Sequence, residues 1–359
     1  MQTTGGSRFL RSNSDGRKSL DNSRCLNYIF AMVGVRSQDH DVLGQLRKEL
    51  RALKSGPLPA WPRIGRFLDD VESWRFWETE QAPSFSHWLR TLALSLGRKE
   101  RILWRYLSAA RFYQEELPPL LKQWKVAAPP LTELPEGVNA ENLELLAKLS
   151  RVAPEEVMEP LARRVVQGEI SRAELTRVWQ TFGPVLGGRT ARGRFVVAPR
   201  IDREDPDQKE RQLAATVYHA LQLGGEWTGY NDLDLYEVFL EVHPPDPPGL
   251  RADRRFDAVA VVRHQGGQPE IHGIEAKGFS GHDVLGDEFA ELAKYCDFVW
   301  FARPEAGDTA DLDSIPQTIG LLRVRGVSVD VVRPAARITH EVSCRESLLG
   351  SLLARAIRV

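Results

Sequence analysis

The sequence has few cysteines, no long apolar run and almost no net charge. The three cysteines, Cys25, Cys296 and Cys344, form no CxxC pair and no metal-binding spacing, which argues against a disulfide framework and a structural zinc site. No stretch approaches the roughly 18 uninterrupted apolar residues of a membrane span. The start, rich in Ser, Asn and Arg, lacks the apolar core of a secretory signal. We therefore expect a cytoplasmic protein without a membrane partner.

Length and composition predict a multidomain chain. With 359 residues, 42% hydrophobic content and nine Trp, the chain can bury more than one core. An all-α N-terminal half is expected to precede an α/β domain with a mixed central sheet. The predicted parts are a flexible leader (1–35), a helical domain with a helix-turn-helix-like segment (36–130), a helical module (131–187), a basic linker (188–207) and the α/β domain (208–359).

The net charge of −1 conceals a basic segment. Residues 84–125 contain eight Lys or Arg and three Glu. Acidic stretches elsewhere cancel this excess in the total. Opposite-signed regions within one chain are typical of a soluble protein with a phosphate-binding face.

The basic segment has the outline of a helix-turn-helix. Ser84 or Ser86 can cap a helix with an apolar stripe, and Gly97 can end it. A second helix is expected over residues 98–114, and a short turn followed by a basic helix is typical of major-groove binding. The alternative is an ordinary helical hairpin with its cations in solvent. On the exposed face of the second helix we expect the predicted DNA contacts Lys99, Arg101, Arg105 and Arg111.

Two further segments complete the N-terminal half. Residues 140–149 and 154–167 predict helices, and the capping box of Ser171 and Glu174 opens another over residues 172–181. This module has no cluster of titratable residues, so we interpret it as a structural or dimerisation element, with a homodimer as the corresponding expectation. The linker that follows could track a phosphate backbone or be a basic linker without a partner. Its candidate contacts are Arg189, Arg192 and Arg194.

Three charged residues stand on two apolar, strand-like runs. The runs RFDAVAVV (255–262) and EIHGIEAK (270–277) flank a Gly- and Pro-containing hairpin loop. A hairpin symmetric about Gly266 places Asp257 opposite Glu275, and Lys277 shares the face of Glu275. Two carboxylates and one ammonium would then meet, as a Mg²⁺ site acting on phosphate requires. Such triplets also arise by chance at solvated strand edges, but charges within apolar runs are rare unless paired or metal-bound.

The C-terminal half resembles a known nuclease superfamily. Its predicted order is helix (208–223), strand (235–242), the two strands above, helix (283–295) and strand (298–302). This order resembles the core of the restriction-endonuclease-like, PD-(D/E)xK, superfamily. The motifs FDAVA (256–260), IEAK (274–277), YCD (295–297) and WFA (300–302), with Ser280, Asp283, Leu285, Asp287 and the IP…GLL pattern of residues 315–322, are similar to those of the MmcB-type DNA-repair family.

The resemblance implies a metal-dependent nuclease. It makes Asp257 and Glu275 ligands of Mg²⁺, which Mn²⁺ could replace, and Lys277 the catalytic lysine. It adds Glu210 from the first helix, although Glu210 could instead belong to a solvated helix face. The expected activity is endonucleolytic cleavage of DNA in repair, defence or mobile-element processing.

Two alternatives stay open. One is a DNA-binding or scaffolding protein with an inactive nuclease fold, and the other is an RNA endonuclease. After Asp287 the resemblance calls for a basic residue and Trp, whereas this chain has Glu288 and Phe289. That departure favours the inactive alternative, whereas the intact triad favours an enzyme.

Overall fold

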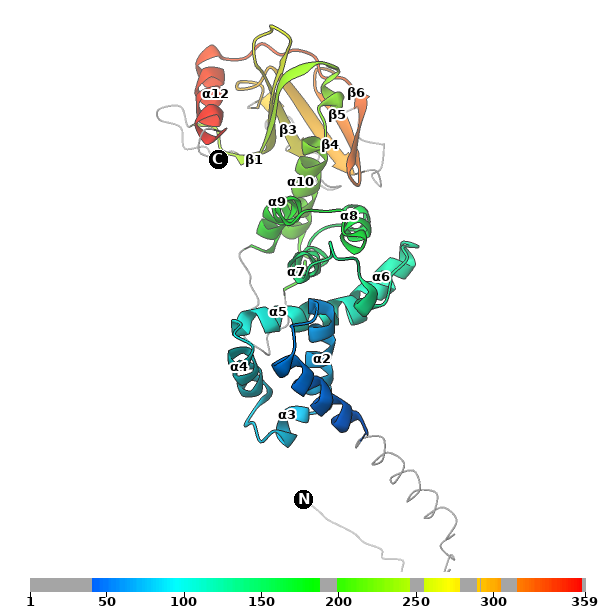
Figure 1. The fold of residues 1–359 in the computed structure, drawn as a ribbon. Coiled ribbons are helices and arrows are strands. Elements are labelled where there is room, and N and C mark those ends of the chain that lie inside the picture. The colour runs from blue at the N-terminus through cyan, green and yellow to red at the C-terminus, as the bar shows by residue number, and fades with distance from the viewer. Residues whose placement is uncertain are drawn as a thin grey trace, which may run out of the picture. The chain divides into compact units, whose positions relative to one another are not determined.

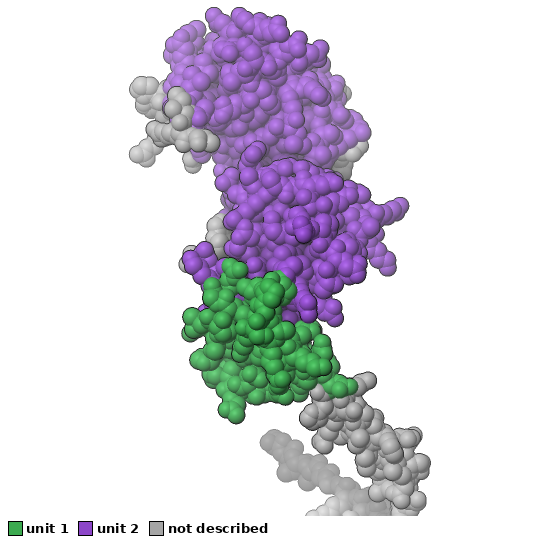
Figure 2. All heavy atoms as spheres, in the orientation of Figure 1, with its two compact units in different colours: residues 1–59, 70–98 green, residues 60–69, 99–359 purple. Residues whose placement is uncertain are grey.

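The structure is a computed structural model that describes residues 41–187, 199–245, 255–277, 289–290, 292–304 and 315–356. It has two compact units, one of residues 1–59 and 70–98 and one of residues 60–69 and 99–359 (Figure 2). No described helix is long and apolar enough to cross a membrane. Several predictions fall outside the described residues: the leader (1–35), the linker arginines Arg189, Arg192 and Arg194, and the start of the helix expected at 283–295.

Helix α4 (Phe85–Ser95) begins and ends where its sequence predicts (Figure 1). The Ser84 hydroxyl accepts a hydrogen bond from the His87 N–H at 3.2 Å, which satisfies one of the free donors of the first turn. Gly97 follows the helix with a φ of 61°, the left-handed conformation that commonly terminates helices. The helical segments before it are residues 41–55, α2 (Trp61–Ser73) and α3 (Phe76–Thr79).

The second predicted helix of the basic segment changes geometry along its length. Helix α5 (Glu100–Arg111) starts after Lys99, whose backbone is extended. It continues through a π-helical turn, η1 (Phe112–Glu116), into α6 (Leu117–Gln123). The predicted single helix over residues 98–114 is therefore replaced by three consecutive helical segments.

The boundary between the two compact units falls between Arg98 and Lys99. Helices α4 and α5 thus belong to different units. The helix-turn-helix stays a prediction, and it does not correspond to one compact part of this structure.

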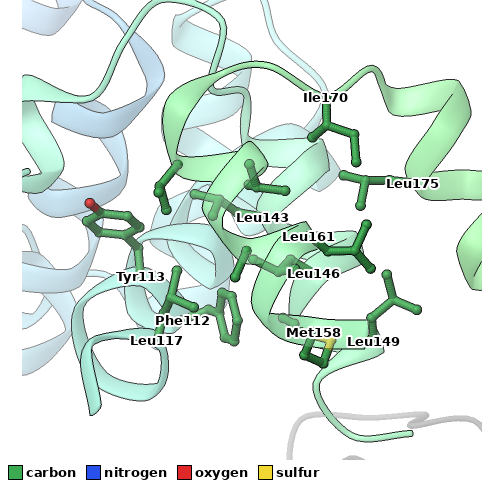
Figure 3. Packing of buried hydrophobic residues seen from close by; sticks show 14 of the residues in the cluster. Phe112, Tyr113, Leu117, Leu143, Leu146, Leu149, Met158, Leu161, Ile170 and Leu175 are labelled. Atoms are coloured by element: carbon green, nitrogen blue, oxygen red, sulfur yellow. The ribbon is translucent and has the colours of Figure 1, made fainter. Parts of the chain in front are cut away.

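The helical module follows its predicted boundaries closely. Helix α7 spans Ala140–Leu149, α8 spans Glu155–Gln167 and α9 spans Arg172–Phe182. The Ser171 hydroxyl accepts a hydrogen bond from the Glu174 N–H, and Gly168 ends α8 with a φ of 74°. Short 3-10 turns flank the module, η2 (Leu131–Glu133) and η3 (Gly183–Leu186). Its core is apolar (Figure 3) and includes Phe112, Leu117, Leu143, Leu146, Leu149, Met158, Leu161 and Leu175.

The C-terminal part contains the predicted mixed sheet. Its six strands lie in the order β1-β2-β3-β4-β5-β6. The first three strands are antiparallel neighbours, β4 is parallel to β3 and β5 to β4, and β6 closes the sheet antiparallel to β5. The bounds are β1 (Leu233–Val242), β2 (Phe256–His264), β3 (Glu270–Ala276), β4 (Phe298–Pro304), β5 (Gly320–Arg325) and β6 (Ser328–Arg333).

Helices cover both faces of the sheet. On one face, α10 (Pro206–Gln222) contributes Val217 and Leu221 to a core with the strand residues Ala260, Ile274, Trp300 and Leu322. On the other, α12 (Val342–Ala356) contributes Leu348 and Leu352 to a core with Val259, Ile271, Val299 and Leu321. Successive residues of a strand point to opposite faces, so residues of the two cores alternate along the central parts of the strands. The short turn η4 (Glu226–Thr228) joins α10 to β1.

Candidate active site at the end of strands β2 and β3

Strands β2 and β3 bring Asp257 and Glu275 together. Ala258 lies opposite Ile274 in this antiparallel pair, so the next pair outward is Asp257 and Glu275. The connecting turn contains Gly266 with a φ of 69°, which glycine adopts without steric cost. The predicted register is confirmed. Both carboxylates therefore leave one face of the sheet at one end.

Each carboxylate continues an apolar row into the end of the sheet. Asp257 follows Val261 and Val259 along one face of β2, and Glu275 follows Ile271 along β3. Asp257 is 4% exposed and Glu275 is 6% exposed. Burying charge this deeply costs free energy unless a partner or a metal ion compensates it.

One ammonium group serves two carboxylates. Lys277 Nζ lies 3.2 Å from Glu275 Oε1 and donates to Glu210 Oε1 at 3.0 Å. Glu210 stands near the start of α10. The sequence left open whether Glu210 joins the site or a solvated helix face. The structure brings it to Lys277, although its side chain stays 41% exposed.

The negative charge of Asp257 is compensated less fully than that of Glu275. Its Oδ2 accepts a hydrogen bond from the Ala276 N–H at 2.8 Å, while Arg255 Nη2 lies 3.7 Å from Oδ1, beyond hydrogen-bonding distance. Burial raises the pKa of Asp257 to about 6, although the Ala276 N–H, Lys277 and Arg255 oppose the rise. Its negative charge is thus only partly stabilised by the protein.

The residues present suit a hard divalent cation. Mg²⁺ takes oxygen ligands, commonly one or two carboxylates completed by water and substrate phosphate. Asp257 and Glu275 supply such a pair, and the Asp257 carboxylate retains uncompensated charge. Within the described ranges, no group of three or more His, Cys, Asp or Glu side chains could hold a metal ion. Of the described side chains, Asp257 and Glu275 are the pair that could hold a metal at this end of the sheet.

The predicted DNA contacts of the basic segment separate into two kinds. Lys99 and Arg101 are exposed. Arg105 does not project into solvent as predicted, because it pairs with Glu141 and with Glu144 at 2.9 Å. Arg111 Nε likewise lies 2.7 Å from Asp69 Oδ1, although the Arg111 side chain stays 36% exposed. Both arginines are committed to contacts with other helices, which sequence spacing within one helix could not reveal.

A second pair of buried carboxylates lies at the opposite end of β3. Glu270 begins β3, and Asp297, directly before β4, is 1% exposed. Arg337 pairs with Glu270, and Arg345 Nη2 lies 3.0 Å from Asp297 Oδ2. The Tyr230 hydroxyl also donates to Glu270 at 2.9 Å. Sequence spacing does not reveal this cluster, because the arginines lie far along the chain from β3.

The negative charges of this second cluster are well compensated by its neighbours. Burial alone would raise the pKa of Glu270, but His272, Tyr230 and Arg337 together lower it to about 2. The Asp297 carboxylate also accepts a hydrogen bond from the Ile271 N–H at 2.8 Å. The cluster therefore joins β3 and β4 to the chain segment that leads into α12.

Comparisons with known proteins add a structural likeness. No protein-family model and no curated protein matches the chain. The chain is similar to a solved structure, the SPO1766 protein of unknown function from Silicibacter pomeroyi, with 24% identity and a TM-score of 0.30. The match covers 43% of this chain and 88% of that protein. A likeness this weak carries no argument about activity, so function has to be inferred from the geometry of the site.

Proposed function

We propose that this chain is a Mg²⁺-dependent nuclease that hydrolyses phosphodiester bonds in DNA, with a restriction-endonuclease-like domain as its catalytic part. The convergence of Asp257, Glu275 and Lys277 at one end of the sheet carries the proposal. The order of elements supports it as well. A helix, three antiparallel strands and a fourth strand parallel to the third is the arrangement expected of that superfamily.

The roles of the carboxylates follow from their burial and charge. Asp257 and Glu275 would hold Mg²⁺, which when bound makes water a better nucleophile and neutralises charge on the scissile phosphate. The apolar residues beside them, Val259 on β2 and Phe301 opposite Glu275 on β4, keep bulk water away from this end of the sheet. Electrostatic interactions are stronger where the local dielectric is low.

Lys277 supplies a fixed positive charge at the edge of the pair. Its ammonium can donate to a phosphate oxygen or to the attacking water, and such a donor is most effective where charge develops in the transition state. Glu210 and Glu275 hold the ammonium from two sides. Glu210 is therefore a positioning residue in this proposal, because it orients Lys277 and contacts no reacting atom.

DNA is proposed as the substrate because of the basic segment. Lys99 and Arg101 expose their side chains, as phosphate contacts require. A basic helix also suits the major groove of B-form DNA better than the deep, narrow groove of RNA.

The test is a cleavage assay with the full chain on plasmid, linear duplex and single-stranded DNA and on RNA, in Mg²⁺ or in EDTA. We expect Mg²⁺-dependent cleavage of DNA that is lost in Asp257→Ala, with thermal melting showing that the variant is folded. Cleavage in EDTA, or by Asp257→Ala, would overturn the assignment. Cleavage of RNA alone would keep the site and change the substrate. Metal-independent DNA binding without cleavage would favour the scaffolding alternative.

A further inference from the structure

The neighbours of Lys277 on the sheet are arginines. The Lys277 N–H donates to the Ala302 carbonyl at 3.2 Å, which continues the parallel register of β3 and β4 past the end of β3. Arg303 is therefore the residue beside Lys277. Arg303 in turn lies opposite Arg323 in the parallel pair of β4 and β5. One cation thus comes from each of three adjacent strands.

All three cations leave the face that carries the carboxylates. In β4, Val299 and Phe301 belong to the core under α12, and Arg303 follows them at the same two-residue spacing. In β5, Leu321 belongs to that core and Arg323 follows it. Each strand thus ends its apolar row with a charged residue.

The order of charges across the sheet is directional. Reading from β2 to β5, the carboxylates Asp257 and Glu275 come first and the cations Lys277, Arg303 and Arg323 follow. Neighbouring strands are about 4.8 Å apart, so the cations span about 10 Å. Phosphates of one DNA strand advance about 3.4 Å each along the helix axis. The row therefore spans about three such steps and can face three to four consecutive phosphates.

Both arginines have accessible positions. Arg303 and Arg323 are half-buried, as expected when the aliphatic part of an arginine packs on a sheet and its guanidinium reaches solvent. Asp330 lies opposite Arg323 on β6, but its carboxylate is taken by Arg325 at 3.1 Å. Among the residues that the structure describes, Arg323 makes no ion pair, so its charge is available to another partner.

We propose that Arg303 and Arg323 bind the phosphates on one side of the scissile phosphate, so that a nucleic acid strand crosses the sheet from β3 towards β5. The proposal rests on the proposed function, since it takes Lys277 as the position of the scissile phosphate. Arg303 and Arg323 are substrate-binding residues in this arrangement. They set the direction in which the strand lies relative to Asp257 and Glu275.

The test measures binding of a fluorescent duplex DNA and a single-stranded oligonucleotide to the full chain in EDTA over a range of salt concentrations. Arg323→Gln and Arg303→Gln should each bind several-fold more weakly. The slope of log K against log salt should become shallower by about 0.9 for duplex and about 0.7 for single-stranded DNA. Arg323→Lys should keep the wild-type slope, because it keeps the charge.

The matched control is Arg263→Gln. Arg263 lies at the other end of β2, where it pairs with Asp234 at 3.0 Å, and its removal changes the net charge equally. Thermal melting identifies a variant that fails to fold, and Arg323→Gln alone is sufficient if Arg303→Gln is such a variant. An Arg323→Gln slope equal to that of wild type, or an equal loss in Arg263→Gln, overturns the inference.

A parallel cleavage assay in Mg²⁺ separates this inference from the proposed function. If the wild type cleaves DNA and Arg323→Gln equals it in DNA binding and in cleavage rate at low substrate, the phosphate row is overturned. The nuclease proposal then still stands. Arginine-dependent binding without any cleavage would support the row and overturn the nuclease proposal. Loss of binding with an unchanged rate at saturating DNA supports both.

Discussion

The two ends of strand β3 hold the same kind of residue in opposite circumstances. At one end, Lys277 pairs with Glu275 and Glu210, and burial raises the pKa of Asp257 to about 6. At the other end, Glu270 and Asp297 face arginines, and the pKa of Glu270 falls to about 2. All four carboxylates are at most 6% exposed, but Glu270 has more hydrogen-bond donors and counter-charge around it, whereas Asp257 is more strongly desolvated.

This difference separates a structural cluster from a functional one. A buried carboxylate with full ionic compensation contributes to folding and has little left to offer a ligand. A buried carboxylate with incomplete compensation costs stability, and such residues are concentrated at functional sites. The difference is the one expected if the end of β3 that holds Glu275 is the proposed catalytic site and the end that holds Glu270 is structural.

The largest expected effect concerns Lys277. In Lys277→Ala, the cleavage rate at saturating DNA should fall on the order of 10²–10³-fold, because an electrostatic donor to the transition state is lost. Steady-state kinetics with DNA in excess over the protein measure this rate. If binding collapses while the rate at saturation is unchanged, Lys277 is a phosphate anchor and its catalytic role is wrong.

The next effect is on stability and has an unusual sign. The folded pKa of Asp257, about 6, lies above its ordinary value of 3.8, so the folded protein binds this proton more tightly than the unfolded chain. The free energy of unfolding should therefore fall as pH rises from about 4 to about 6. Asp257→Asn keeps an acceptor for the Ala276 N–H and should be more stable at pH 7 by about 2–3 kcal/mol.

Urea denaturation in EDTA across this pH range measures the effect. The advantage of Asp257→Asn should vanish below about pH 4, where Asp257 is protonated in both states. A variant that is less stable than wild type at pH 7 would show that the charge of Asp257 is already compensated, and the contrast between the two ends of β3 would be lost.

Glu270 should give the opposite sign. Its pKa is lowered from 4.5 to about 2, so its contribution to stability is present above about pH 4.5 and is lost as pH falls towards 2. Glu270→Gln should destabilise the protein by about 1–2 kcal/mol at pH 7. The estimate is modest because Arg337 is 57% exposed and solvent screens the pair. Equal stability of variant and wild type at pH 7 would contradict a structural role.

The smallest expected effect extends the comparison to cations. Arg101 is exposed, whereas Arg105 pairs with Glu141 and Glu144. Arg101→Ala should make the slope of log K against log salt shallower by about 0.9 for DNA binding. Arg105→Ala should lower the melting temperature and leave that slope unchanged. If instead Arg105→Ala made the slope shallower and Arg101→Ala left it unchanged, Arg105 would be a DNA contact.

Local features of this fold could be predicted from the sequence. The caps at Ser84 and Ser171 and the stop at Gly168 depend on residues a few positions apart, and they lie where predicted. The register of Asp257 opposite Glu275 is also local, because a hairpin loop and alternating burial fix it. The candidate triad therefore followed from pattern alone.

Features that depend on distant segments could not be predicted. Arg105 meets carboxylates of α7, and Glu270 meets Arg337 from beyond β6. Only tertiary packing brings these groups together. Similarly, Arg303 and Arg323 are 20 residues apart in the chain and become neighbours only through the parallel pairing of β4 and β5. Ion pairs and charge rows of this kind have no periodic pattern in the chain.

The most direct test of the account uses the two glutamates of β3 as a matched pair. Glu275→Gln and Glu270→Gln make the same chemical change on the same strand at opposite ends. Single-turnover cleavage of duplex DNA in Mg²⁺ and thermal melting should be measured on both. Glu275→Gln should lose cleavage and melt no lower than wild type, whereas Glu270→Gln should melt lower and cleave at the wild-type rate when folded. The account would be contradicted if Glu275→Gln cleaved DNA at the wild-type rate. It would also be contradicted if cleavage were lost only in a folded Glu270→Gln variant.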